Sequence, residues 1–226
     1  MKSISVARAV GVMLLALPLI AGCMLTRNPA PLSILAPSVK TEARAAEQAV
    51  NWSLQVQRPV ADAMRDSDRV LVRRAQSRLQ VYAGAAWLDS VPEMLQALMI
   101  QSFSDTGSFT GVSRAGGMRT RFSLASELRH FEVVDDGGPD LTVEIALQAS
   151  LIHQRTARPV ASQTFAQQRR IDGKGLDAVV GGFEQALDSL MEELIDWVFE
   201  QSASAAARME RETDPRGRWQ RQDSDG

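Results

Sequence analysis

The stretch Leu141–Leu151, LTVEIALQASL, decides the fold. Every second residue in it is apolar, and most of the residues between are polar. This period of two is typical of a strand with one covered face and one polar face, as found in antiparallel sheets. The apolar set is Leu141, Val143, Ile145, Leu147, Ala149 and Leu151.

Two further strands are expected beside this one. The turn sequence DDGGP at 135–139 separates it from a preceding strand within Phe122–Arg129, in which apolar and polar residues alternate again. A later strand, at about Val160 to Arg170, is more polar. That polarity predicts a place at an edge of the sheet or against a partner.

A long amphipathic helix follows the turn Asp172–Gly175, DGKG. Its apolar residues recur at three- and four-residue spacing over about six turns, so the helix is expected to cover the sheet. These residues are Leu176, Val179, Val180, Phe183, Leu187, Leu190, Met191, Leu194 and Val198.

The first half of the chain has the same plan with shorter strands. Trp52–Val56 alternates and stops before Pro59, and Val70–Arg73 with Leu79–Tyr82 indicates a hairpin. Ser90–Glu93, SVPE, has the spacing of a capping box at the start of a helix. The apolar face of that helix is Val91, Met94, Leu95, Leu98, Met99 and Phe103.

Three strands and a helix, repeated once, predict a single α+β domain. Its sheet is expected to be mainly antiparallel, with the two amphipathic helices packed on one face. The composition agrees, because 45% of the 226 residues are hydrophobic and 23% are charged. Loss of residues 1–22 would leave 23 basic and 27 acidic side chains, a formal charge of −4. This excess of negative charge argues against nucleic acid as a partner.

The amino terminus has the order of a secretory signal. Lys2 and Arg8 precede the apolar run Val10–Ala21, which is shorter than the ~20 residues that cross a bilayer and contains Pro18. A cleaved export signal at 1–22 is therefore favoured over a membrane-spanning anchor.

The residues around the cleavage site resemble a bacterial lipobox: Ile20, Ala21, Gly22 and then Cys23, the one cysteine of the chain. The resemblance implies that Cys23 is alkylated with diacylglycerol, becomes the first residue and is acylated. Two or more acyl chains give stable anchoring, at about 0.8 kcal/mol per buried methylene. The alternative is an ordinary thiol beside a standard cleavage site.

Met24 follows the cysteine, where the lipoprotein sorting scheme that the resemblance implies uses Asp for retention at the inner membrane. The periplasmic face of the outer membrane is therefore the favoured location. Residues 23–50 are expected to form the lipidated terminus and a tether; the 28 residues Met24–Asn51 could extend to at most ~90 Å, although Leu32–Leu35 could form a short strand. The folded domain is expected at 51–201.

Residues 202–226 are alanine-rich and then strongly charged, and are expected to be a disordered tail. Trp219 lies within this tail. It is interpreted as a solvated aromatic residue, with a weak docking element as the alternative.

The sequence offers little for catalysis. His130 and His153 are the two histidines, both lie in expected strands, and neither has the spacing of a metal ligand pair, so a structural role is favoured. A G-x-S-x-G nucleophile motif is absent, and a lipidated Cys23 leaves no thiol. The chain is not expected to be an enzyme or to bind a metal or cofactor.

The run Val81–Pro92, VYAGAAWLDSVP, preceded by Asp68–Arg73, resembles the ABC-type transport auxiliary lipoprotein family. The lipobox, the strand at 141–151 and the long closing helix add to this resemblance, which covers about 32–201. One departure concerns the start of the domain, where Leu32–Pro37 lacks the tyrosine that the family commonly has there.

The resemblance implies a non-catalytic periplasmic lipoprotein in a system that moves lipid between the two membranes. Its expected partners are a substrate-binding protein of the mammalian-cell-entry type with an ABC permease and ATPase, and the chain itself could form a ring of copies. Tyr82 and Trp87 are the candidate partner-binding residues, since aromatic side chains dominate interface energies. The alternatives are that the two rings pack the first helix onto the sheet, and that the protein is a chaperone or assembly factor for an outer-membrane protein.

Overall fold

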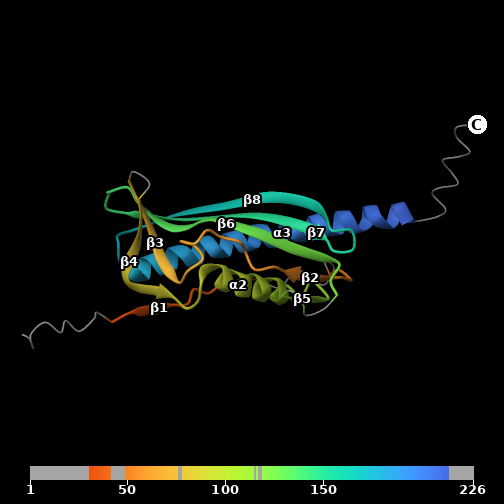
Figure 1. Ribbon diagram of the computed structural model, residues 1–226, viewed down its shortest axis with the longest axis horizontal. Coiled ribbons are helices and arrows are strands. Elements are labelled where there is room, and N and C mark those ends of the chain that lie inside the picture. Colours follow the sequence, from red (N-terminus) through yellow and green to blue (C-terminus); the bar gives the residue numbers. More distant parts are fainter. Residues whose placement is uncertain (1–30, 42–48, 76–77, 115, 117–118, 214–226) are drawn as a thin grey trace, which may run out of the picture. The chain divides into compact units, whose positions relative to one another are not determined.

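The computed structural model describes residues 31–41, 49–75, 78–114, 116 and 119–213. The elements of this part of the chain follow one another in a fixed order, shown in Figure 1. They are β1 (Ser33–Leu35), β2 (Ser53–Val56), β3 (Arg69–Arg74), β4 (Arg78–Trp87), α2 (Val91–Asp105), β5 (Gly111–Ser113), β6 (Phe122–Asp135), β7 (Leu141–His153), β8 (Arg158–Ile171) and α3 (Leu176–Thr213).

Three long antiparallel strands, β6, β7 and β8, form the main body of the sheet. The predicted strand at 141–151 lies in the middle of this body, as β7. Its apolar residues face those of β6, with pairs such as Leu124↔Leu151 and Val133↔Val143. Within the described residues β8 pairs with β7 alone, which confirms its predicted place at an edge.

A β-bulge explains why β6 is longer than predicted. The register shifts between Leu128 and His130, so the core-facing positions change from even to odd numbers, and Phe131 and Val133 continue the buried row. The simple alternation seen in the sequence ends at this point, whereas the strand continues to Asp135.

The far side of β6 pairs with two separate branches of the sheet. Its first residues pair in parallel with β2, which pairs in parallel with β5, and its last residues pair in parallel with β3, which leads to β4 and β1. The predicted β3–β4 hairpin is confirmed. The α+β class is also confirmed, with one correction: the longest pairings are antiparallel, but four shorter ones among the described strands are parallel, so the sheet is mixed.

Both helices are amphipathic. The predicted apolar face of α2 is buried, and so is that of α3 except for Leu176 and Val180, which are partly buried. Helix α3 packs along β7 and β8, and α2 contacts β2, β5 and α3 (Figure 1). Buried Gln96 fixes α2 to β2 by donating a hydrogen bond to the Val56 carbonyl at 2.9 Å. Helix α2 begins after Ser90 as expected, but the capping box is wrong: the Ser90 side chain makes no cap and instead accepts a hydrogen bond from Arg58 at 3.1 Å.

The folded region extends beyond both predicted limits. Strand β1 lies within the segment assigned to the tether, yet it pairs with β4, so the sheet begins at Ser33. At the other end α3 continues to Thr213, and the predicted disorder is wrong for 202–213. Alanine is the strongest helix former, and Ser202, Ala205 and Ala206 are buried. Residues 214–226, with Trp219, lie outside the described part.

Candidate functional site

Cys23 and the lipobox residues Ile20, Ala21 and Gly22 lie outside the described residues. The structure shows where the fold begins, and this limits how far the fold can lie from Cys23. Since Ser33 is already part of the sheet, nine residues connect it to Cys23. Even when fully extended, a chain of that length separates the α-carbons of Cys23 and Ser33 by at most about 35 Å.

Trp87 is not at the surface, which corrects the sequence analysis. It is 1% exposed, and its ring lies edge-on to Phe183 and Phe131, with centroids 4.9 and 5.5 Å away. The cause is tertiary packing, because Phe131 comes from β6 and Phe183 from α3, far away in the sequence; β1 pairs with the edge of β4 at this point, with Leu35 opposite Trp87. The alternative interpretation placed the ring between the first helix and the sheet; the structure instead places it between Phe131 on β6 and Phe183 on the last helix, α3.

Tyr82 is partly buried and joins β4 to the turn before α3. Its hydroxyl donates a hydrogen bond to the Lys174 carbonyl at 2.8 Å. The ring lines a hollow of about 340 Å³ together with Val81, which is 45% exposed. Part of Tyr82 thus remains accessible beside an exposed apolar residue, and its role toward a partner stays a prediction.

An apolar surface that the sequence analysis did not identify lies where β1, β4 and α2 meet. Ile34 is 54% exposed and Leu88 is 68% exposed. The Leu88 N–H donates a hydrogen bond to the Leu35 carbonyl at 2.8 Å, which holds Leu88 against β1. Leu88 also lines a groove of about 240 Å³ along α2. This α2 groove has apolar walls, Pro37, Leu88, Met94, Ala97 and Leu98, and a charged rim, Asp89, Glu93 and Arg114. Exposed apolar surface with a polar rim is typical of protein interaction sites.

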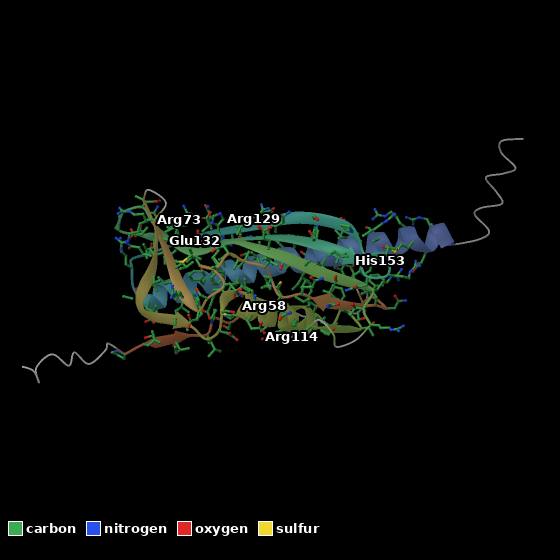
Figure 2. The ribbon with its side chains drawn as sticks, viewed as in Figure 1. Arg58, Arg73, Arg114, Arg129, Glu132 and His153 are labelled. Atoms are coloured by element: carbon green, nitrogen blue, oxygen red, sulfur yellow. The ribbon has the colours of Figure 1, made fainter. Side chains whose placement is uncertain are left out.

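The face of the sheet away from α3 carries a network of charges centred on Glu132. This carboxylate is 0% exposed and accepts hydrogen bonds from two nitrogens of Arg65, at 3.0 and 2.7 Å. The Phe131 N–H donates to it at 3.1 Å, and the His130 Nδ1 lies 2.9 Å from it. Arg73 lies beside Glu132 (Figure 2) and contacts it. Arg73 also contacts Glu144 on the neighbouring strand.

The environment of Glu132 holds it in the charged form. Burial raises the pKa of Glu132, but the hydrogen bonds from His130, Phe131 and Arg65 outweigh burial, and its pKa lies below the ordinary value. The side chains of His130, Glu132 and Glu144 place ligand atoms within 4.8 Å of one another, as a metal site would. Arg65 and Arg73 already balance the two carboxylates, however, so the arrangement is that of a structural ion network. His130 has the supporting role that the sequence analysis favoured.

His153 lies at the opposite end of β6 from this network, in register with Phe122. It is 4% exposed, and its Nδ1 is 3.0 Å from the Thr156 hydroxyl. Burial, followed by the nearby charges of Arg155 and Arg121, lowers its pKa. His153 is therefore neutral at neutral pH.

Comparison with known proteins settles the family. The model of the ABC-type transport auxiliary lipoprotein component matches residues 33–194, from β1 into α3. The chain belongs to this family. The resemblance found in the sequence is thereby confirmed, and the transport auxiliary lipoprotein domain has its first residue at β1.

Other members and neighbours agree on the fold. The crystal structure of protein XCC0632 from Xanthomonas campestris is 34% identical, with a TM-score of 0.73, and the match covers 77% of this transport auxiliary lipoprotein and 99% of that chain. An uncharacterized protein with a crystal structure, 14% identical, has a TM-score of 0.58 over 74% of this chain and 99% of that chain. At this low identity, the likeness shows only that the two chains share a fold.

A relative from Bradyrhizobium diazoefficiens, an uncharacterized protein, is 27% identical over 164 residues, which are 72% of this chain and 41% of the relative. The chain thus spans about two fifths of that relative's length. Membership of a lipoprotein family places the transport auxiliary lipoprotein at a membrane of the cell envelope. None of the helices in the described residues is both long and apolar enough to cross a bilayer.

Proposed function

We propose that this transport auxiliary lipoprotein is anchored through Cys23 to the periplasmic face of the outer membrane and serves, without catalysis, in an ABC-type system that moves lipid between the membranes. The observation that carries the proposal is the family match over 33–194 directly after a lipobox at 20–23. The family is described as a transport component, which supports a non-catalytic role.

The short connection between anchor and fold gives the proposal a geometry. A tether of at most about 35 Å keeps β1 close to the bilayer and raises the effective concentration of the domain for a partner at the same membrane. This is far less than the ~90 Å that a tether reaching to Asn51 would allow. The domain therefore acts beside its membrane.

The α2 groove is the surface we assign to the partner, a substrate-binding protein of the mammalian-cell-entry type. Ile34 is exposed on β1, the described strand nearest the anchor in the sequence, and exposed Leu88 is hydrogen-bonded to the same strand at Leu35. Burial of these side chains by a partner is favourable by about 25 cal/mol per Å² of apolar surface, whereas in the isolated domain they remain in water. Val81 and Tyr82 on β4 add a second area that is accessible, beside the hollow of about 340 Å³.

The anchor is tested with the full chain in its natural membrane. Cells labelled with a fatty acid are expected to give a labelled protein that sediments with the outer membrane on a sucrose gradient. Cys23→Ser is expected to lose both properties. An unlabelled wild-type protein in the soluble periplasmic fraction would contradict the anchor, and sedimentation with the inner membrane would contradict the location.

The partner is tested by a photo-crosslinking residue placed at Leu88, with the same residue at exposed Gln163 on β8 as the control. A crosslink to the mammalian-cell-entry-type protein from Leu88 alone is the expected result. A crosslink to a β-barrel protein would favour the alternative function, an assembly factor. Mass spectrometry of lipids that copurify with the crosslinked complex then tests the transport of lipid.

A further inference from the structure

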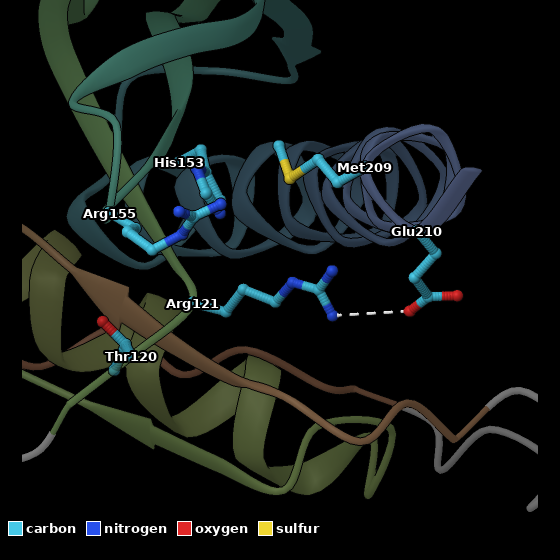
Figure 3. A pocket seen from close by; sticks show the side chains of 6 residues that line it. All are labelled: Thr120, Arg121, His153, Arg155, Met209 and Glu210. Atoms are coloured by element: carbon cyan, nitrogen blue, oxygen red, sulfur yellow. Dashed lines mark ion pairs between the residues drawn. The ribbon is translucent and has the colours of Figure 1, made fainter. Parts of the chain in front are cut away.

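A polar pocket opens where the start of β6, the end of β7 and the last turns of α3 meet (Figure 3). We call it the Arg121 pocket. It is lined by Thr120, Arg121, His153, Arg155, Met209 and Glu210, and its volume is about 380 Å³. This lies within the range of ~300–1,000 Å³ that small-molecule sites occupy.

The pocket contains more positive than negative charge. Arg121 and Arg155 line it, and Arg158 is in register with His153 on the next strand. Glu210 is the acidic lining residue; its carboxylate lies 3.8 Å from the Arg121 Nη1, longer than a hydrogen bond, and its side chain is 69% exposed. An ion pair this open to water contributes little, so an anion that fits the pocket could replace Glu210 beside Arg121.

Arg121 is held in place before any ligand arrives. Its guanidinium lies over the rings of Trp52 and Phe122, 5.3 and 5.9 Å from their centroids. Its backbone is fixed as well, since its N–H donates to the Ser53 carbonyl at 3.3 Å and its carbonyl accepts from the Gln154 N–H at 3.0 Å. Stacking uses the face of the guanidinium and leaves the edge, with its N–H donors, for an oxyanion.

His153 completes the wall of the pocket as a neutral, buried ring. The charges around it come from each neighbouring element: Arg121 directly before β6, Arg155 in the turn after β7, Arg158 on β8 and Glu210 on α3. Two of these, Arg155 and Arg121, add to burial in lowering its pKa. A bound anion would act in the opposite direction and favour the protonated ring. The pKa of His153 therefore reports whether an anion occupies the Arg121 pocket.

We propose that the Arg121 pocket binds a phosphate group, from a phospholipid headgroup or from a free phosphate. The guanidinium fork of Arg121 matches two phosphate oxygens, and Arg155 supplies a second cation in the same lining. Met209 adds an apolar side chain to the same lining. The proposed function assigns anchoring and docking to this domain, and phosphate binding is an additional property that can be measured without any partner.

The test uses the detergent-solubilised full chain, titrated with inorganic phosphate and separately with dihexanoyl phosphatidylglycerol, with chloride as the reference anion. Calorimetry gives the affinity, and NMR of the His153 ring gives its pKa. Binding is expected to raise the pKa of His153. Binding of both compounds supports a general phosphate site, and binding of the phospholipid alone supports a headgroup site; if neither binds, the proposal is overturned.

Three variants separate the pocket from general electrostatics. Arg121→Gln is expected to weaken binding about tenfold or more, the loss of one charge-assisted hydrogen-bonded contact. Arg129→Gln removes the same charge from an exposed position of β6 that does not line the pocket, and should leave binding unchanged. Glu210→Gln removes the competing carboxylate and should strengthen binding, so it decides the matter even if Arg121→Gln does not fold. Equal losses in the two arginine variants, or no gain in Glu210→Gln, would overturn the proposal.

Discussion

Glu132 on β6 and Glu144 on β7 stand directly opposite each other in the antiparallel pairing, and Arg73 contacts both carboxylates. Like charges at opposed positions destabilise a sheet. Arg65, from the segment between β2 and β3, also donates hydrogen bonds from its Nε and Nη2 to the Glu132 carboxylate. The two guanidinium groups thus make it possible for β6 and β7 to pair in this register.

Arg65→Met is expected to reduce the free energy of unfolding by about 3 kcal/mol, because it leaves a buried carboxylate without its main partner. Urea denaturation of the full chain measures this loss. Arg129→Met, a matched change at an exposed position of β6, should alter the midpoint little. If both variants lost a similar amount of unfolding free energy, Arg65 in the network around Glu132 would contribute no more to stability than an exposed arginine.

Stability is expected to fall in acid for two separate reasons. The pKa of Glu132 is lowered in the folded protein, so its contribution is complete above the unfolded value of about 4.3 and disappears as the pH falls through the folded value. The pKa of His153 is lowered as well, and below about 6.5 protonation therefore favours the unfolded chain. Thermal melts between pH 4 and 8 should show the first loss near pH 6, and His153→Gln should remove that part. An unchanged pH profile in His153→Gln would contradict this assignment.

Adjacent glycines in α3 are expected to respond in opposite ways to alanine. A Cβ on Gly182 would lie 2.5 Å from the Ile171 Cγ2 and 3.0 Å from the Val143 Cγ2, and these branched side chains cannot move aside easily. A Cβ on Gly181 would meet nothing within 4 Å. Gly182→Ala should therefore cost about 1–3 kcal/mol through overpacking, whereas Gly181→Ala should stabilise the helix by about 0.5–1 kcal/mol. Equal melting temperatures would contradict this packing of α3 on β7 and β8.

The sequence predicts the fold best where one period continues without interruption. Strand β7 and the apolar face of α3 follow directly from their spacing. Strand β6 is only half predicted, since the bulge after Leu128 changes which residues face the core. The parallel pairing of β2 and β3 with β6 could not be predicted, because pairing between distant strands depends on how the chain is routed rather than on local pattern.

The candidate sites are harder to predict than the fold. Trp87 and Leu88 are neighbours in a stretch that predicts exposed aromatic residues, yet it is Leu88 that lies in water. Arg65 with Glu132, and Arg121 with Arg155, are brought together by strand pairing across wide sequence separations. Charge spacing along the chain contains no signal for such pairs.

The contrast between Trp87 and Leu88 is itself testable. Trp87→Ala leaves a large cavity beside Phe131 and Phe183 and should cost about 3–5 kcal/mol. Leu88→Ser should leave the melting temperature nearly unchanged but abolish capture of the partner, because its side chain is exposed. Pull-down and thermal melts on the same two variants separate packing from docking. A folded Trp87→Ala variant that loses its partner would reverse the assignment.

The last turns of α3 are expected to stabilise the domain, although their sequence indicates a disordered tail. Ala205 is 1% exposed and belongs to the hydrophobic core, whereas its neighbour Ser204 is exposed. Ala205→Gln forces a long polar side chain into this packing and should cost about 1–3 kcal/mol, while Ser204→Gln, a change to the same residue one position earlier, should have little effect. Guanidinium denaturation of both variants compares them directly. Equal stability would mean that residues after Gln201 contribute nothing to the core, as a disordered tail would.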